Sequence, residues 1–115
     1  MSHSTHRPRA DRLRPQALVF AALGDETRLL LIAKLSVGRV YSIAQLTQGT
    51  EVTRQAVTKH LRVLEDAGIV HSVHKGRENL FEFDPRPMDE LRAYLDRVSA
   101  DWDQALQRLK AFVER

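Results

Sequence analysis

Apolar residues recur at helical spacing in the first third of the chain and predict two helices there. The first helix begins near Pro15 and carries a short apolar stripe that ends at Gly24. Asp25 is a favourable N-cap for the second helix, which has a broad apolar face and stops near Gly38.

Two further patterns predict a pair of helices joined by a tight turn. Ser42 and Gln45 have the spacing of a capping box, and Gly49 offers a left-handed stop, so the helix over residues 42–48 is short. Thr53 is the expected N-cap of a helix over residues 53–67. The apolar positions of that helix share one face: Val57, Leu61 and Leu64. Such a pair has the shape of a helix-turn-helix.

The last part of the chain predicts a β-hairpin and one long helix. β-prone runs at residues 70–73 and 80–83 flank a turn at residues 75–79. After Pro87, apolar residues follow at alternating spacings of three and four residues: Met88, Leu91, Leu95, Val98, Trp102, Ala105, Leu109 and Phe112. The predicted fold is therefore mainly α with a small β-hairpin, in the order four helices, hairpin, helix.

The heptad seam of the last helix favours a two-fold dimer. A helix of this size extends about 40 Å, which is longer than the core of a small domain can cover. The alternative is one long core helix that packs against the first helix of the same chain. The expected interface comprises Leu18, Val19, Ala22, Leu91, Leu95, Val98, Trp102, Ala105 and Leu109.

The outer face of the helix over residues 53–67 carries groups suited to DNA. Gln55, Lys59 and Arg62 lie opposite its buried face. Arg and Gln make bidentate contacts to base edges, whereas Lys is a point charge for phosphates. The hairpin, as a wing over residues 74–79, adds basic residues at its tip. The predicted DNA contacts are Ser42, Thr53, Arg54, Gln55, Thr58, Lys59, His60, Arg62, Lys75 and Arg77.

The length and composition fit a single domain, and the positions of the charged residues show where the excess positive charge lies. The 115 residues include 18 Lys and Arg against 15 Asp and Glu, a net charge of +3. The excess lies in residues 1–14 and 53–77. We predict a flexible basic arm over residues 1–14, which either solubilises the protein or contacts phosphates, a helix-turn-helix core over residues 15–86 and a dimerisation helix over residues 87–115.

Several classes of protein are disfavoured by the sequence. Cysteine is absent, which excludes disulfides, thiolate metal sites and a cysteine nucleophile. No apolar run approaches the ~20 residues of a membrane span, and the N-terminus has no apolar signal core. No phosphate-binding loop, Rossmann glycine pattern or histidine–serine–carboxylate set is present. We therefore expect a cytoplasmic protein that is not an enzyme and has neither a cofactor nor a membrane partner.

Two segments carry a family resemblance. Ala22–Ile32, with the sequence ALGDETRLLLI, resembles the opening of the ArsR (arsenic-repressor) family of winged helix-turn-helix regulators. Residues 55–64, QAVTKHLRVL, followed by AGIV at residues 67–70, resemble its recognition helix. The resemblance runs from about Pro15 to Phe83. It implies a homodimeric regulator, usually a repressor, that binds an inverted-repeat operator on double-stranded DNA.

The resemblance also bears on what the protein senses. It places the thiolate ligands of many family members on Ser42 and Ala44, which cannot bind soft metals. A second family site lies on the last helix, which here has no histidine. We therefore predict no metal site. A small-molecule effector at the dimer interface near Tyr94 and Trp102, or control by protein level alone, stays open. The alternative function is a winged-helix protein-interaction module without specific DNA binding.

Overall fold

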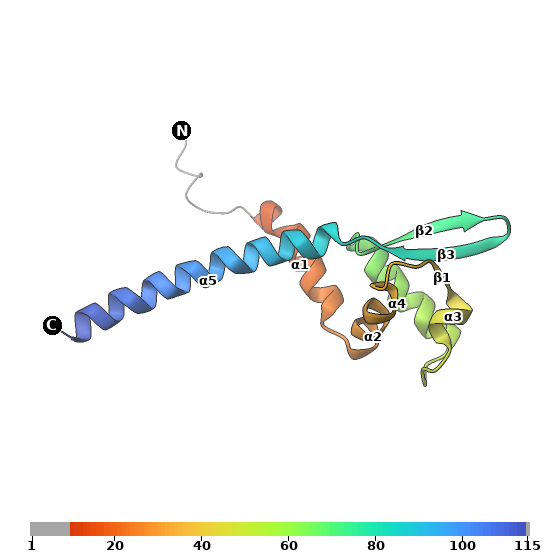
Figure 1. Cartoon of the computed structure of the whole chain (residues 1–115), viewed down its shortest axis with the longest axis horizontal. Coiled ribbons are helices and arrows are strands. Elements are labelled where there is room, and N and C mark those ends of the chain that lie inside the picture. Colours follow the sequence, from red (N-terminus) through yellow and green to blue (C-terminus); the bar gives the residue numbers. More distant parts are fainter. Residues whose placement is uncertain (1–9, 115) are drawn as a thin grey trace.

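The computed structural model describes residues 10–114, and their side chains from residue 13 onward, as a winged helical domain with one protruding helix (Figure 1). The small domain lies at one end, and the long last helix leads away from it. The elements in chain order are α1 (Ala10–Leu23), α2 (Glu26–Leu35), β1 (Tyr41–Ser42), α3 (Ile43–Thr47), α4 (Arg54–Asp66), β2 (Val70–Lys75), β3 (Glu78–Phe83) and α5 (Arg86–Val113).

Side-chain caps start three of the helices, as predicted. The backbone N–H of Arg28 donates to Asp25 Oδ2 at 3.0 Å at the start of α2. At the start of α3, Ser42 and Gln45 form both hydrogen bonds of a capping box. Thr53 Oγ1 accepts from the third residue of α4 at 3.1 Å. These caps are local, which is why the sequence alone located the three helix starts.

The first helix begins earlier than predicted. α1 starts at Ala10, whereas the apolar stripe indicated a start near Pro15, which lies inside the helix. The additional first turn, residues 10–14, carries no apolar stripe. Proline is also most common at the first position of a helix, so the sequence pattern indicated a start at Pro15. Residues 10–14 of the predicted flexible arm are therefore helical, and the rest of that arm lies outside the described residues.

The sheet has a third strand that the sequence did not predict. β3 pairs antiparallel with β2 along its length and with the short β1 on its other edge, giving the order β1-β3-β2. β1 has two residues, too few for alternation to be visible. The turn of the hairpin is Gly76-Arg77, between the paired Lys75 and Glu78. Gly76 has a φ of +60°, which suits the first central residue of a type II′ turn.

The core lies between α4 and the other elements of the winged domain. The three predicted apolar residues of α4 are fully buried, together with residues from α1, α2, α3 and the sheet. α5 is different, because Leu91 near its start is its only buried residue. The first turns of α5 pack on the core, and the rest of the helix extends beyond it. The molecule is therefore elongated, with principal extents of 67 × 37 × 22 Å.

Candidate nucleic-acid interface

The outer face of α4 presents four exposed donor side chains. Arg54, Gln55, Lys59 and Arg62 are all exposed, while the opposite face of the helix is buried in the core. Burial of one face fixes the helix, so the positions of these side chains follow from its orientation. The predicted division of α4 into a core face and a polar face is therefore present in the structure.

The three predicted hydroxyl contacts already serve the backbone. Ser42 Oγ and Thr53 Oγ1 accept hydrogen bonds from backbone N–H groups as N-caps, and each keeps its own proton for a further acceptor. Thr58 Oγ1 donates to the carbonyl of Arg54 at 2.8 Å. Ser42 and Thr53 can therefore still donate to a phosphate, whereas the hydroxyl of Thr58 already donates its proton within the helix.

His60 packs against the start of α2, and its contact with DNA stays a prediction. Its Nδ1 lies 3.2 Å from Arg28 Nη1 and 3.7 Å from Asp25 Oδ2, and the side chain is mostly covered. On a helical wheel of α4, His60 lies at the edge of the buried face. Its contacts with Arg28 and Asp25 hold the side chain against the start of α2. The structure therefore gives Nδ1 of His60 a partner in α2.

Arg28 connects three helices through contacts that no local sequence pattern predicts. Its Nε donates to the carbonyl of Ala22 at 2.7 Å and its Nη2 to that of Ala21 at 3.2 Å, so it caps the end of α1 from within α2. The hydrogen bond from its backbone N–H lowers the pKa of Asp25. Through its contact with His60, the same guanidinium links α1 and α2 to α4.

Lys34 holds the turn of the helix-turn-helix. From the last turn of α2, its Nζ donates to the carbonyls of Leu46 at 3.3 Å and Gln48 at 2.9 Å, at the end of α3. These carbonyls have no partner within so short a helix. A cation at the C-terminal end of a helix is also electrostatically favourable. No local sequence pattern predicts this contact, because the two carbonyls lie 12 and 14 residues from Lys34 in the sequence.

The wing carries two exposed cations and is attached to α4. Lys75 and Arg77 are exposed at its tip, as the sequence predicted. Ser72 Oγ in β2 donates to Glu65 Oε2 near the end of α4 at 2.8 Å. The wing and the helix are therefore coupled by a direct hydrogen bond as well as by the core.

Asp84 fastens the base of the wing to the start of α5. This carboxylate, which is almost completely buried, accepts from the backbone N–H and the guanidinium of Arg86, and it lies 2.8 Å from His71 Nε2. The Arg86 hydrogen bonds, followed by that of His71, hold the pKa of Asp84 well below its ordinary value. The sequence indicated only that the hairpin ends here.

The predicted dimer residues divide into two sets. Val19, Ala22 and Leu91 are buried in the core of their own chain, so little of their surface is left for the predicted interface. The core takes them because α1 packs against both α4 and the first turns of α5. Val98 and Ala105 are half-buried, and the remaining predicted residues are exposed apolar side chains: Leu18, Leu95, Trp102 and Leu109.

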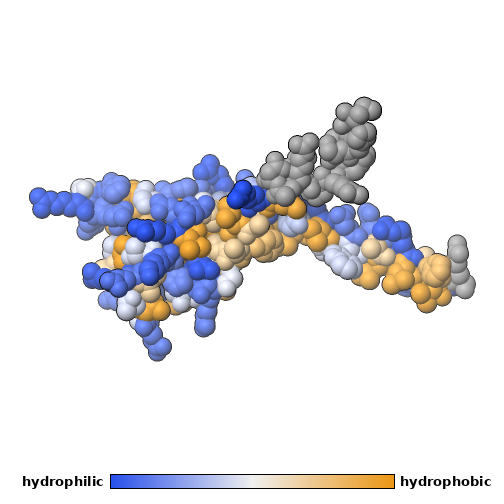
Figure 2. Space-filling model, turned by 180° about the vertical axis from the view of Figure 1, so that it is seen from behind, coloured by the Kyte–Doolittle hydropathy of each residue, from blue (hydrophilic) through white to orange (hydrophobic). Residues whose placement is uncertain are grey.

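Further apolar side chains extend the exposed stripe of α5. Leu106, Phe112 and Val113 are exposed near its C-terminal end, and Phe20 is exposed on α1. Figure 2 shows hydrophobic surface reaching from the centre of the molecule along the protruding helix, in contrast to the polar surface of the winged end. The stripe far exceeds the isolated apolar residues of an ordinary surface.

Two other kinds of site are absent from the described part of the chain. Among residues 13–114, whose side chains are described, no group of three or more His, Asp or Glu side chains is arranged to hold a metal ion. In the same part of the chain, no helix is long and apolar enough to cross a membrane.

Comparison with known proteins identifies the family. Residues 25–72 match the family model described as bacterial regulatory protein, arsR family. The HTH-type transcriptional regulator YuzN of Bacillus subtilis (strain 168) is 40% identical over 79 residues, which cover 64% of this chain and 86% of that protein. The chain belongs to the ArsR family. Its fold is the winged helix-turn-helix, as the resemblance implied, and it is a member without cysteine.

Solved structures support the assignment. An ArsR-like transcriptional regulator from Rhodococcus sp. RHA1 is 34% identical, with a TM-score of 0.84, over 93% of this chain and 97% of that one. Mb0332 from Mycobacterium bovis, described as a homodimeric winged helix-turn-helix DNA-binding domain, has a TM-score of 0.62 at 18% identity, over 94% of this chain and 93% of that one. At that identity the second similarity concerns the fold alone.

Proposed function

We propose that this ArsR-family protein is a homodimeric transcriptional repressor that binds a near-palindromic operator. In this proposal α4 enters the major groove and the wing tip contacts the neighbouring backbone. The observation that carries it is the outer face of α4, where four donor side chains stand exposed on a helix whose other face is fully buried.

The chemistry of that face supports both recognition and affinity. Arg54, Gln55 and Arg62 carry planar donor groups that match guanine and adenine edges, and each good bidentate pair discriminates by ~1–3 kcal/mol. Lys59 and the wing cations Lys75 and Arg77 supply charge for phosphates. The hydroxyls of Ser42 and Thr53 retain protons that suit phosphate oxygens at the N-terminal ends of α3 and α4.

The exposed stripe of α5 supports the proposal of a two-fold dimer. Its apolar residues continue far past the winged domain, where no other described element of the chain covers them. A second copy would cover this stripe, and the homodimeric neighbour from Mycobacterium bovis shares the fold. Two-fold symmetry would place the recognition helices about 34 Å apart, in successive major grooves. Because this function acts on DNA, we place the protein in the bacterial cytoplasm.

The experiment measures binding to the DNA upstream of the gene that encodes this chain, by footprinting and by titration at several salt concentrations. Affinity should fall steeply as salt rises. Arg62→Ala should weaken specific binding by ~1–3 kcal/mol, whereas Lys75→Ala should reduce the slope of log affinity against log salt by about 1. Arg108→Ala, which removes the same charge from α5, is the control.

The rival function predicts a different result. A winged-helix module that binds only proteins would show no protected DNA and no salt-sensitive affinity. A footprint that is equally strong in wild type and in the Arg62→Ala variant would contradict the placement of α4 in the groove.

A further inference from the structure

The side chains of Arg28 and His60 meet where the start of α2 packs against α4. A guanidinium has donor groups only, so in the 3.2 Å contact between Arg28 Nη1 and His60 Nδ1 the ring nitrogen accepts. An imidazole that accepts at Nδ1 is neutral when it carries a single proton, and that proton lies on Nε2. The contact with Arg28 therefore selects one tautomer of His60.

Asp25 is the second charged group beside the ring, and it does not take this nitrogen from Arg28. Its Oδ2 lies 3.7 Å from His60 Nδ1, which is beyond the length of a hydrogen bond. The same oxygen already accepts from the backbone N–H of Arg28 at 3.0 Å. A proton on Nδ1 would also point at the guanidinium 3.2 Å away. Both observations favour an unprotonated Nδ1.

The opposite ring nitrogen of His60 has a proton to donate to a group outside the chain. Nε2 has no hydrogen-bond partner among residues 13–114, and it is not one of the buried atoms that lack a partner. It therefore reaches the solvent, although the His60 side chain as a whole is only 22% exposed. A ring that is anchored at one nitrogen and partly covered loses little conformational freedom when its other nitrogen binds.

His60 lies on a flank of α4, beside the outer face that the proposed function assigns to base edges. It follows the exposed Lys59 in the sequence, but its contacts hold the ring on the side of α2. A helix in the major groove presents its outer face to the bases and its flanks to the backbones that border the groove. The acceptor that a donor on this flank meets is a phosphate oxygen.

From this geometry, we propose that Nε2 of His60 donates a hydrogen bond to a phosphate of the operator backbone, and that Arg28 is the positioning residue that keeps the proton on Nε2. The inference rests on the proposed function, because it needs α4 in the groove. Arg28 itself does not touch DNA. It holds Nδ1 and is held in turn by the carbonyls of Ala21 and Ala22 at the end of α1. A neutral donor on a charged acceptor adds affinity without adding charge to the protein.

The tautomer is tested in the full-length protein without DNA, by the nitrogen chemical shifts of the His60 ring. His60→Asn assigns the signal, because it removes it. At about pH 8, where free imidazole is mostly neutral, the wild type should carry the proton on Nε2. In Arg28→Ala the population with the proton on Nδ1 should rise, because Asp25 is then the nearest partner of that nitrogen. A proton on Nδ1 in the wild type, or an unchanged tautomer in Arg28→Ala, would overturn the positioning role.

Three substitutions of His60 separate the functions of the two ring nitrogens. The amide oxygen of Asn lies as many bonds from Cα as Nδ1, so His60→Asn keeps an acceptor for Arg28 and loses the outer donor. The amide nitrogen of Gln corresponds in the same way to Nε2, so His60→Gln keeps the donor and loses the acceptor. His60→Ala loses both.

Operator affinity and thermal stability should therefore respond differently in these variants. Affinity should fall about tenfold in His60→Asn and His60→Ala, but less than about threefold in His60→Gln. The midpoint of thermal unfolding should stay closer to the wild type in His60→Asn than in His60→Gln, because only the former still accepts from Arg28. Binding of His60→Asn as tight as that of the wild type, or binding of His60→Gln as weak as that of His60→Ala, would refute the contact.

Single phosphates of the operator identify the acceptor. Replacement of one phosphate by an uncharged methylphosphonate should weaken wild-type binding about tenfold at the contacted position and hardly change that of His60→Asn. In salt titrations, Lys59→Ala should reduce the slope of log affinity against log salt by about 1, whereas His60→Asn should leave the slope unchanged, because a neutral donor releases no counterion. Equal responses of wild type and His60→Asn at every phosphate would overturn the proposal.

The proposed function and this inference fail in different ways. A wild-type protein that protects no DNA would refute the proposed function and the phosphate contact with it, and would leave the tautomer result standing. Operator binding that His60→Asn does not weaken would refute the phosphate contact alone.

Discussion

The exposed seam of α5 gives a prediction whose size follows from the structure. Leu95 and Trp102 lie seven residues apart on one face of the helix and are 44% and 63% exposed in the single chain. Burying the exposed part of Trp102, about 150 Å² for a side chain of about 250 Å², is worth about 4 kcal/mol at ~25 cal/mol per Å². The exposed part of Leu95 adds about 1 kcal/mol.

Replacement of both residues by Glu should therefore abolish dimers. Two copies double the contribution, and counting only half of this area as covered leaves about 5 kcal/mol per dimer. This corresponds to an increase of more than about a thousandfold in the dimer dissociation constant. Sedimentation equilibrium measures that constant, and footprinting should show that operator protection is lost with the dimer.

The control places the same charges on the far side of the helix. Ala93 and Ala100 are also seven residues apart and exposed, but they lie away from the seam. Ala93→Glu with Ala100→Glu should leave the dimer intact. Unchanged dimerisation of the Leu95→Glu/Trp102→Glu variant, with helix content preserved, would refute the assignment of this seam. Dimer loss in the control would show that charge alone is responsible.

Substitutions at three further positions test contacts and backbone geometry within the chain. Arg28→Ala should lower the free energy of unfolding by about 2 kcal/mol in urea titrations, because two helix-end carbonyls lose a charged donor, and Arg28→Lys should restore only part of it. Asp84 stabilises the fold fully above its unfolded pKa of about 4, and this contribution is lost as pH falls below that value. Asp84→Asn should therefore reduce the fall in the free energy of unfolding at acid pH. An unchanged fall would show that other groups cause it. Gly76→Ala should cost about 1 kcal/mol from its positive φ alone, since nothing lies within 4 Å of the added Cβ. A neutral effect in thermal melts would contradict the turn geometry.

Local signals in the sequence located most of the helix-turn-helix. The capping side chains of α2, α3 and α4 act within three residues, and the buried face of α4 follows from spacing along one helix. Periodicity and capping are properties of a short segment, so the segment itself reports them. The basic tip of the wing was predicted for the same reason.

Contacts between distant segments were not predictable in this way. Lys34 reaches across the turn to α3, and Arg28 joins α1 and α2 to His60 in α4, over separations of up to 32 residues. The contact between Arg28 and His60 could not be predicted, because a helical wheel holds no information about the neighbouring helix. The two-residue β1 is visible only through its pairing with β3.

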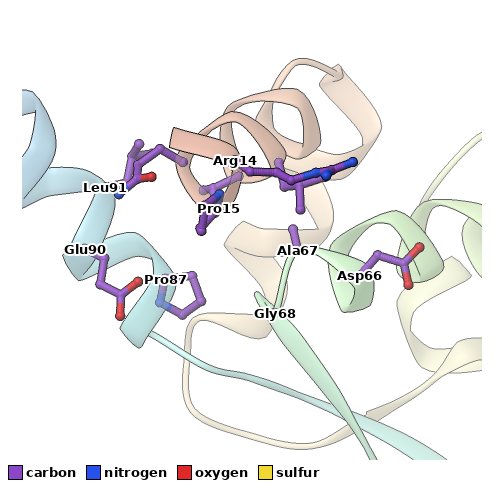
Figure 3. Close-up of a pocket in the computed structure, with 11 residues that line it drawn as sticks. Arg14, Pro15, Asp66, Ala67, Gly68, Pro87, Glu90 and Leu91 are labelled. Atoms are coloured by element: carbon purple, nitrogen blue, oxygen red, sulfur yellow. The ribbon is translucent and has the colours of Figure 1, made fainter. Parts of the chain in front are cut away.

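The sequence by itself determined the order of the helices and the hairpin, the two faces of α4, the heptad seam and, through its motifs, the family. The tertiary structure decided which apolar residues belong to the core and which stay exposed in the single chain. It buried Val19, Ala22 and Leu91 and left Leu95 and Trp102 exposed. All five fit the same apolar pattern, and only the packing of α1 on α4 and α5 separates them. A groove bounded by α1, the end of α4 and the start of α5 arises in the same way, because its walls come from three helices that no local pattern brings together (Figure 3).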